Sequence, residues 1–159
     1  MTRQIAYIFI TLFFFSCHST KSRIVKYPKS PDYLVTGYYH ISKDSDKYQR
    51  QLYGTTLKYN LIPTPIITVE NFTNVAVDKN NFGNYYIHIG LDESGGQKWS
   101  EETAKSIGDS LAIIVNNELI QVALVMSQIT SPVTAINPRD LTKSQAEKYL
   151  LDIKAKMRN

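Results

Sequence analysis

The chain has 159 residues, 43% of them apolar, and carries 18 Lys and Arg residues against 14 Asp and Glu residues, a formal net charge of +4. Its length favours one domain with enough apolar material for a core, and its single cysteine rules out an intramolecular disulfide framework. The basic residues are scattered among acidic ones without a basic helix or an aromatic-basic motif, which disfavours nucleic-acid binding.

The amino terminus has the features of an export signal. Arg3 precedes an apolar run over residues 5–15, about half of the roughly twenty residues that a helix needs to cross a bilayer. Such a run is typical of the core of a secretory signal that is removed from the mature protein. Ser16 and Cys17 follow, and the segment resembles a bacterial lipoprotein signal, with Phe14 where Leu is commonest. An ordinary signal peptide with an incidental cysteine and an uncut membrane anchor are the alternatives.

The lipoprotein resemblance implies that residues 1–16 are removed and that Cys17 becomes an acylated amino terminus. Several acyl chains anchor a protein far more firmly than one chain does. The modified thiol would then be neither a nucleophile nor a metal ligand. His18 follows the cysteine, which by the enterobacterial sorting rule implies the outer membrane, facing the periplasm. The expected location is therefore the bacterial cell envelope.

Residues 17–34 are expected to form a flexible basic tether behind the lipidated cysteine. Their composition is polar, basic and interrupted by Pro28 and Pro31, which is typical of a linker. The basic side chains could contact anionic lipid headgroups or could simply be solvated. Residues 35–159 are predicted to form a single domain.

Strands are expected over residues 35–41 and 85–91, because both segments are short and rich in β-branched and aromatic residues. Residues 62–69 contain two prolines and are at best an edge segment. Thr68 is predicted to cap a single helical turn that leads into a further apolar segment at residues 75–77.

A helix followed by a hairpin is predicted next. Trp99, Thr103 and Ile107 recur every four residues, which indicates an amphipathic helix that Asp92 or Ser94 caps and that ends at a glycine, Gly108. Two apolar strands, residues 111–115 and 119–125, flank the Asn116-Asn117 turn, since asparagine tolerates positive φ. Their continuous apolar character predicts strands covered on both faces or a hairpin packed under helices.

The last predicted element is a helix that begins at Thr142, with Gln145 completing a capping box. Its apolar face is formed by Ala146, Tyr149, Leu150, Ile153 and Met157. The element order predicts an α+β fold, a small antiparallel or mixed sheet with two helices packed on one face.

Residues 91–130 carry a family resemblance. Gly95, Trp99, Ile107-Gly108 and Leu111-Ala112-Ile113, followed by a two-residue turn and Leu119-Ile120, resemble the head subdomain of the large periplasmic domain of SecD. The likeness extends over about residues 36–157. Asn116-Asn117 replaces the usual Asp-Gly, and Gln121-Val122-Ala123 replaces Ser-Ala-Pro.

The SecD resemblance implies a non-catalytic binding head on the trans side of the membrane that holds an emerging polypeptide or contacts Sec translocon components. SecD works through a transmembrane part with SecF, and this chain has no second hydrophobic span, so it cannot be a proton-driven motor by itself. A structural or small-ligand envelope module is the alternative function. The hairpin could expose a groove or sheet edge to an unfolded chain, or could be wholly internal. The candidate contact residues are Gln121, Ala123, Leu124, Tyr86 and His88.

Catalytic and metal sites are not expected. His40 and His88 share strand faces with Tyr38 and Tyr86, and are predicted to lie on the polar side of the sheet. Neither histidine belongs to an HxxH or HExxH motif, so no zinc site is predicted. The paired carboxylates 92–93 and 101–102 belong to a helix start and a solvated helix face, and no cofactor motif is present.

Overall fold

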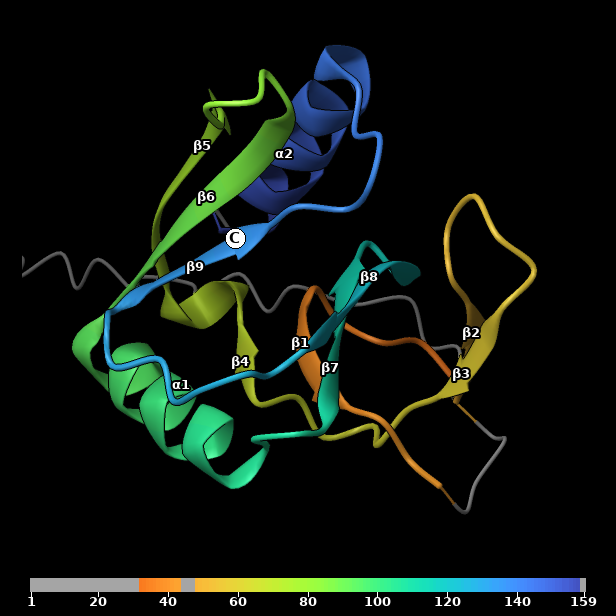
Figure 1. Ribbon diagram of the computed structural model, residues 1–159, viewed down its shortest axis with the longest axis vertical. Coiled ribbons are helices and arrows are strands. Elements are labelled where there is room, and N and C mark those ends of the chain that lie inside the picture. Colours follow the sequence, from red (N-terminus) through yellow and green to blue (C-terminus); the bar gives the residue numbers. More distant parts are fainter. Residues whose placement is uncertain (1–31, 44–47, 158–159) are drawn as a thin grey trace, which may run out of the picture.

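The computed structural model describes residues 32–43 and 48–157 (Figure 1). The predicted signal, Cys17 and nearly all of the predicted tether lie outside the described residues. The strands are β1 (Gly37–His40), β2 (Gln49–Gln51), β3 (Lys58–Asn60), β4 (Ile67–Thr68), β5 (Phe72–Lys79), β6 (Tyr85–Leu91), β7 (Ser110–Val115), β8 (Glu118–Leu124) and β9 (Val133–Ile136). The helices are the 3-10 turn η1 (Val69–Asn71), α1 (Glu93–Lys105) and α2 (Lys143–Met157).

The strands form three antiparallel sheets, with the orders β4-β1-β7-β8, β5-β6-β9 and β2-β3. In Figure 1 the β5-β6-β9 sheet and α2 make up the upper part of the molecule, and α1 and the four-stranded sheet lie below. Both helices contribute to the same core cluster, through Trp99 of α1 and Tyr149 of α2. The predicted α+β class is confirmed, with β8 and β9 as edge strands of their sheets.

The β7-β8 hairpin closes through Asn116 and Asn117, whose φ angles are 49° and 69°, as predicted for this turn. Apolar side chains of β7 alternate between two clusters: Ile113 joins the main core, and Ile114 joins a smaller cluster with Leu34. Both faces of the four-stranded sheet are therefore covered, which explains the continuous apolar sequence of the strand.

Helix α1 begins as predicted, with the Asp92 side chain accepting a hydrogen bond of 2.6 Å from Gly95 N. Gly95 also lets the helix approach η1 closely, because a Cβ at this position would lie 2.7 Å from Asn71 Cβ. The prediction that Ile107 continues the apolar face is wrong. The helix ends at Lys105, and the Ile107 side chain is 56% exposed beyond it.

Helix α2 carries the predicted capping box: Gln145 N donates to Thr142 Oγ1, and Thr142 N donates to Gln145 Oε1. Its buried residues are Ala146, Tyr149 and Ile153, which pack toward β5 and β6. The predicted apolar face of this helix is confirmed.

Two expectations about strands are corrected. Tyr38 is not on a polar face: it is 2% exposed and belongs to the main core, while His40 lies on the same face at the end of β1, half-buried. The short strands β2, β3 and β9 were not predicted. Among the described residues, no helix is both long enough and apolar enough to span a membrane.

Candidate functional site

A cavity of about 470 Å³ lies between the two edge strands β8 and β9. Ala123 and Leu124 of β8 line one side, and Val133 and Ala135 of β9 line the other. No charged side chain lines this cavity among the residues that the structure describes. Its chemistry therefore suits apolar groups.

Two aromatic rings from the core also line the cavity. Tyr38 and Trp99 pack edge to face with ring centroids 4.7 Å apart. Thr134 Oγ1 donates a hydrogen bond of 3.0 Å to the Tyr38 hydroxyl, which joins β9 to β1. Burial raises the pKa of Tyr38, so its phenol is neutral at physiological pH.

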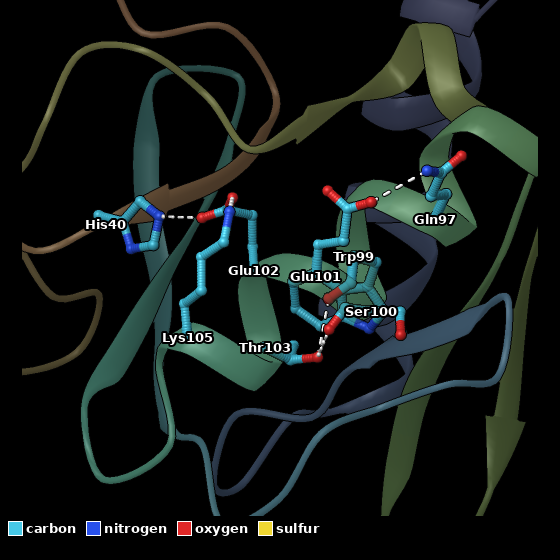
Figure 2. A network of polar contacts seen from close by, with 8 residues as sticks. All are labelled: His40, Gln97, Trp99, Ser100, Glu101, Glu102, Thr103 and Lys105. Carbon is cyan, nitrogen blue, oxygen red and sulfur yellow. Dashed lines mark hydrogen bonds and ion pairs between the residues drawn. The ribbon is translucent and has the colours of Figure 1, made fainter.

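The segment that follows β8 forms a further wall and is attached to α1. Ile129 N donates a hydrogen bond of 3.0 Å to Thr103 Oγ1, and Gln128 Nε2 donates one of 2.9 Å to Ser100 Oγ. Figure 2 shows Thr103 bonded in turn to the carbonyl oxygen of Trp99, at 2.7 Å. These bonds fix the wall of the cavity relative to its aromatic lining.

The mouth of the cavity is apolar and exposed. Leu124 is 56% exposed and Met126 is 77% exposed, while Ile129 and Val133 are also on the surface. Of the two alternatives for the hairpin, the exposed edge therefore holds at the carboxyl end of β8, because that strand is the edge of its sheet and Leu124 is exposed there. A contiguous exposed apolar surface around a hollow is a typical interaction site.

A second cavity, of about 500 Å³, lies at the other end of β8 and is more polar. Gln121, Tyr53, Arg139 and Asp140 are among its lining residues. Gln121 Oε1 accepts a hydrogen bond of 2.6 Å from Asn137 N, so this side chain connects β8 to the end of β9. The second cavity therefore offers polar groups of both charges.

The structure brings together only part of the predicted contact set. Ala123 and Leu124 line the apolar cavity, and Gln121 lines the polar one. Tyr86 and His88 lie on β6, half-buried, and alternate with Ile87 and Ile89, which face the core. They are therefore on the face of the β5-β6-β9 sheet opposite the core, and neither residue lines either cavity, although Ala135, the β9 neighbour of His88, lines the apolar one.

Within the described part of the chain, no group of three or more His, Cys, Asp or Glu side chains could hold a metal ion. His40 instead contacts Glu102 of α1, with Nε2 and Oε2 3.0 Å apart, and Lys105 Nζ lies 2.7 Å from Glu102 Oε1 (Figure 2). This cluster connects β1 to α1. It has the character of a structural ion pair on a partly exposed surface.

Tyr38, Trp99 and Met126 line the cavity but were not among the predicted site residues. The helical periodicity of Trp99 indicates burial and gives no sign of a neighbouring cavity. Met126, directly after the strand predicted at residues 119–125, is the one local signal, because an exposed apolar residue just beyond a strand end is unusual on a free surface.

Comparisons with known proteins agree on one family. The family model described as SecDF, P1 head subdomain, matches residues 45–155. No curated protein matches the chain significantly. A solved structure of SecDF in the super-membrane-facing form is similar with a TM-score of 0.61 and 14% identity, covering 77% of this chain and 19% of that one. A structure of the membrane component SecDF that enhances protein export is similar with a TM-score of 0.62 and 16% identity, covering 78% of this chain and 63% of the other.

The chain therefore spans less than two thirds of the length of either of these structures. At these identities the similarity establishes a shared fold. The matched region contains both edge strands and all the residues that line the cavity between them except Tyr38.

Proposed function

Because the chain belongs to the SecDF P1 head subdomain family, we propose that it is a non-catalytic binding head that holds unfolded polypeptide and assists protein export. The observation that carries this proposal is the apolar cavity between β8 and β9 with its exposed apolar mouth. An unfolded chain exposes apolar side chains that a folded protein buries, so such a cavity discriminates between the two.

The proposed partners are exported polypeptides in transit or components of the Sec translocon. One similar structure is that of a membrane component that enhances protein export. Ala123, Leu124 and Gln121 are the proposed contact residues on β8. Tyr86 and His88 are a separate proposed contact surface, on the outer face of β6.

The proposed location is the bacterial cell envelope, with the domain held at the membrane by the lipid on Cys17 and facing the periplasm. Residues 17–34 would connect the lipid to the domain. An anchored head of this kind would work beside the translocon without spanning the membrane itself.

The test measures binding of reduced, carboxymethylated α-lactalbumin, a permanently unfolded protein, to the full chain in lipid nanodiscs. Leu124→Asp places a charge at the mouth of the cavity and is expected to weaken binding at least tenfold. Leu151→Asp is the matched control, because Leu151 is 68% exposed on α2 and does not line the cavity. Equal affinity of all three proteins, or equal binding of native α-lactalbumin, would contradict the proposal.

The second candidate function is that of a small-ligand or structural envelope module. The polar cavity lined by Gln121, Arg139 and Asp140 favours it, because charged and amide groups there could orient a small polar molecule. A photo-crosslinker at Gln121 or Leu124 in living cells separates the two functions. Crosslinks to a pulse-labelled exported protein or to SecD and SecF support the export role, and a small-molecule adduct alone supports the second function.

A further inference from the structure

The free edge of β8 carries main-chain groups without a strand partner among the described residues, and it borders the apolar cavity at Leu124. Val125 N donates to the carbonyl oxygen of Asp109 at 2.9 Å, so the main chain of Val125 is directed toward the β7 side. Because main-chain groups alternate in direction along a strand, those of Leu124 and Val122 point away from β7. Within residues 32–43 and 48–157, no strand other than β7 pairs with β8 at these two residues.

The free edge of β9 has the same property. Leu91 N donates to the carbonyl oxygen of Pro132 at 2.9 Å, so the main chain of Pro132 faces β6, and the main-chain groups of Val133 and Ala135 point away from it. Asn137 N, two residues beyond Ala135, donates to Gln121 Oε1 of β8. The free edge of β9 is therefore directed toward β8, and both edges border the cavity.

Trp99 adds an unpartnered donor at the same place. Its side chain lines the cavity and is 4% exposed, and its Nε1 is buried without a hydrogen-bond partner among the described residues. A buried indole N–H usually has an acceptor, since leaving it unpaired costs free energy. The ring that lines the cavity therefore carries a buried donor without a partner, beside two open strand edges.

We infer that the occupant of this cavity is an extended main chain, inserted as a strand between β8 and β9, with one of its carbonyl oxygens accepting a hydrogen bond from Trp99 Nε1. This inference rests on the proposed function and specifies how the polypeptide is held. A compact apolar molecule would fill the same space and leave the strand edges and the indole N–H unpaired. An extended chain satisfies all of them, as strand addition to a sheet edge does elsewhere.

The geometry also sets what the inserted segment must be. The open edge runs from Leu124, which lines the apolar cavity, to Val122, which lines the polar one, over about 7 Å at the strand rise of roughly 3.3 Å per residue, so three to five residues would be bound. Alternate side chains would face Tyr38 and Trp99 and should be apolar. The Gln121–Asn137 hydrogen bond closes one end, so the segment would enter beside Leu124 and Val133.

The experiment uses the full chain in lipid nanodiscs and a capped heptapeptide that alternates serine and valine. A second heptapeptide, of the same sequence with N-methylated valines, retains the side chains but lacks the valine N–H donors, which all point to one edge of the peptide when it is extended. Trp99 is the only tryptophan of the chain, so the single indole N–H signal in a nitrogen-15 NMR spectrum reports on Nε1 alone. The unmethylated peptide is expected to move this signal downfield and to bind at least tenfold more tightly than the methylated one.

A variant provides an independent measurement. Trp99→Phe keeps an aromatic ring and removes the donor, and is expected to weaken binding of the unmethylated peptide about fivefold to tenfold, the range that one buried hydrogen bond supplies. Thermal unfolding of the variant checks that it folds, and the methylated peptide tests the inference in the unaltered protein. Equal affinity for the two peptides together with an unmoved indole signal would overturn strand insertion. In that case, a loss of α-lactalbumin binding in Leu124→Asp would still support the proposed function. If neither the peptides nor unfolded α-lactalbumin bound the unaltered chain, strand insertion and the proposed function would both be contradicted.

Discussion

Gly37 shows how closely two strands of the four-stranded sheet approach each other. It pairs with Thr68 of β4, and a Cβ atom at this position would lie 2.3 Å from the carbonyl oxygen of Ile67. Since that neighbour is main chain, it can move only if the strand moves. We expect Gly37→Ala to lower the free energy of unfolding by about 2 kcal/mol, the usual scale of overpacking, measured by urea denaturation.

Gly90 provides the matched control for Gly37, because it also lies in a strand. The nearest atom to a Cβ there is the Thr73 side-chain oxygen at 3.0 Å, which can rotate away. Gly90→Ala should cost less than half as much. Equal losses for the two variants would mean that the approach of β4 to β1 does not restrict position 37.

Asn117 and Asn116 both have positive φ, but their side chains have different roles. Asn117 Oδ1 accepts hydrogen bonds from Leu34 N at 2.9 Å and from Arg50 Nη2 at 2.8 Å. Asn117→Gly relaxes the backbone but leaves the Leu34 N–H without this acceptor, so we expect a net loss of about 1 kcal/mol in unfolding free energy. Asn116→Gly should be neutral or slightly stabilising, because its side chain makes only a 3.5 Å contact with the Tyr33 hydroxyl. Denaturation curves that reverse this order would contradict the role of Asn117.

The ion-pair cluster between β1 and α1 predicts a dependence of stability on pH. Hydrogen bonding from Lys105, and to a lesser degree from His40, holds the pKa of Glu102 below its usual value of 4.5, against the opposing effect of desolvation. A folded-state pKa below the unfolded one contributes stability above the unfolded value, and this contribution disappears as the pH falls through the folded value.

The corresponding variant is Glu102→Gln. We expect it to lower the unfolding free energy at pH 7 by at most about 1 kcal/mol, the scale of exposed ion pairs, and the difference from the unaltered protein should shrink as the pH falls from 5 to about 3. Glu101→Gln is the control, because the hydrogen-bond partner of Glu101 is the uncharged Gln97 and its charge has the smallest of the effects on the Lys105 pKa. A difference that stayed constant with pH would show that Glu102 acts through packing and not through charge.

Elements with strong local signals were predicted well. The strand expected at residues 85–91 coincides with β6, and the caps at Asp92 and Thr142 form as expected, because these signals depend only on neighbouring residues. Strands β2 and β3 were missed because their sequences, Gln-Arg-Gln and Lys-Tyr-Asn, are polar and mostly exposed and are held by pairing with each other. Strand β9 has four residues and exists through its pairing with β6, which no local pattern reveals.

The candidate site was predicted only in part, for the same physical reason. Ala123 and Leu124 were selected from an apolar strand, and both line the cavity. The cavity itself lies between the edges of two sheets whose strands come from distant parts of the chain. The Trp99 donor is unusual only because its Nε1 has no hydrogen-bond acceptor among the described residues. A sequence pattern indicates burial, whereas an unpaired buried group becomes visible only in three dimensions.

In the molecule as a whole, the open edges of β8 and β9 border a cavity beside the common core into which both helices pack, and Tyr38 and Trp99 belong both to that core and to the cavity lining. Function at a membrane then depends on what positions this body there. Cys17, the only cysteine, follows an apolar run and a small residue in the manner of a lipoprotein signal. The prediction is that the protein from cells lacks residues 1–16 and begins with an acylated Cys17.

Mass spectrometry of the amino-terminal peptide and labelling of cells with alkyne palmitate measure this directly. The unaltered protein should take up the label and remain with the membrane after a salt wash, because several acyl chains bind far more strongly than electrostatic contacts of the basic tether.

Cys17→Ala should take up no label and should retain residues 1–16, since cleavage by the lipoprotein route requires the modified cysteine. A variant with the four basic tether residues changed to Gln is the control and should stay membrane-bound; those residues are Lys21, Arg23, Lys26 and Lys29. An unlabelled wild-type protein with its first sixteen residues intact would instead indicate an uncut anchor, and the apolar amino-terminal segment would then hold the domain at the membrane.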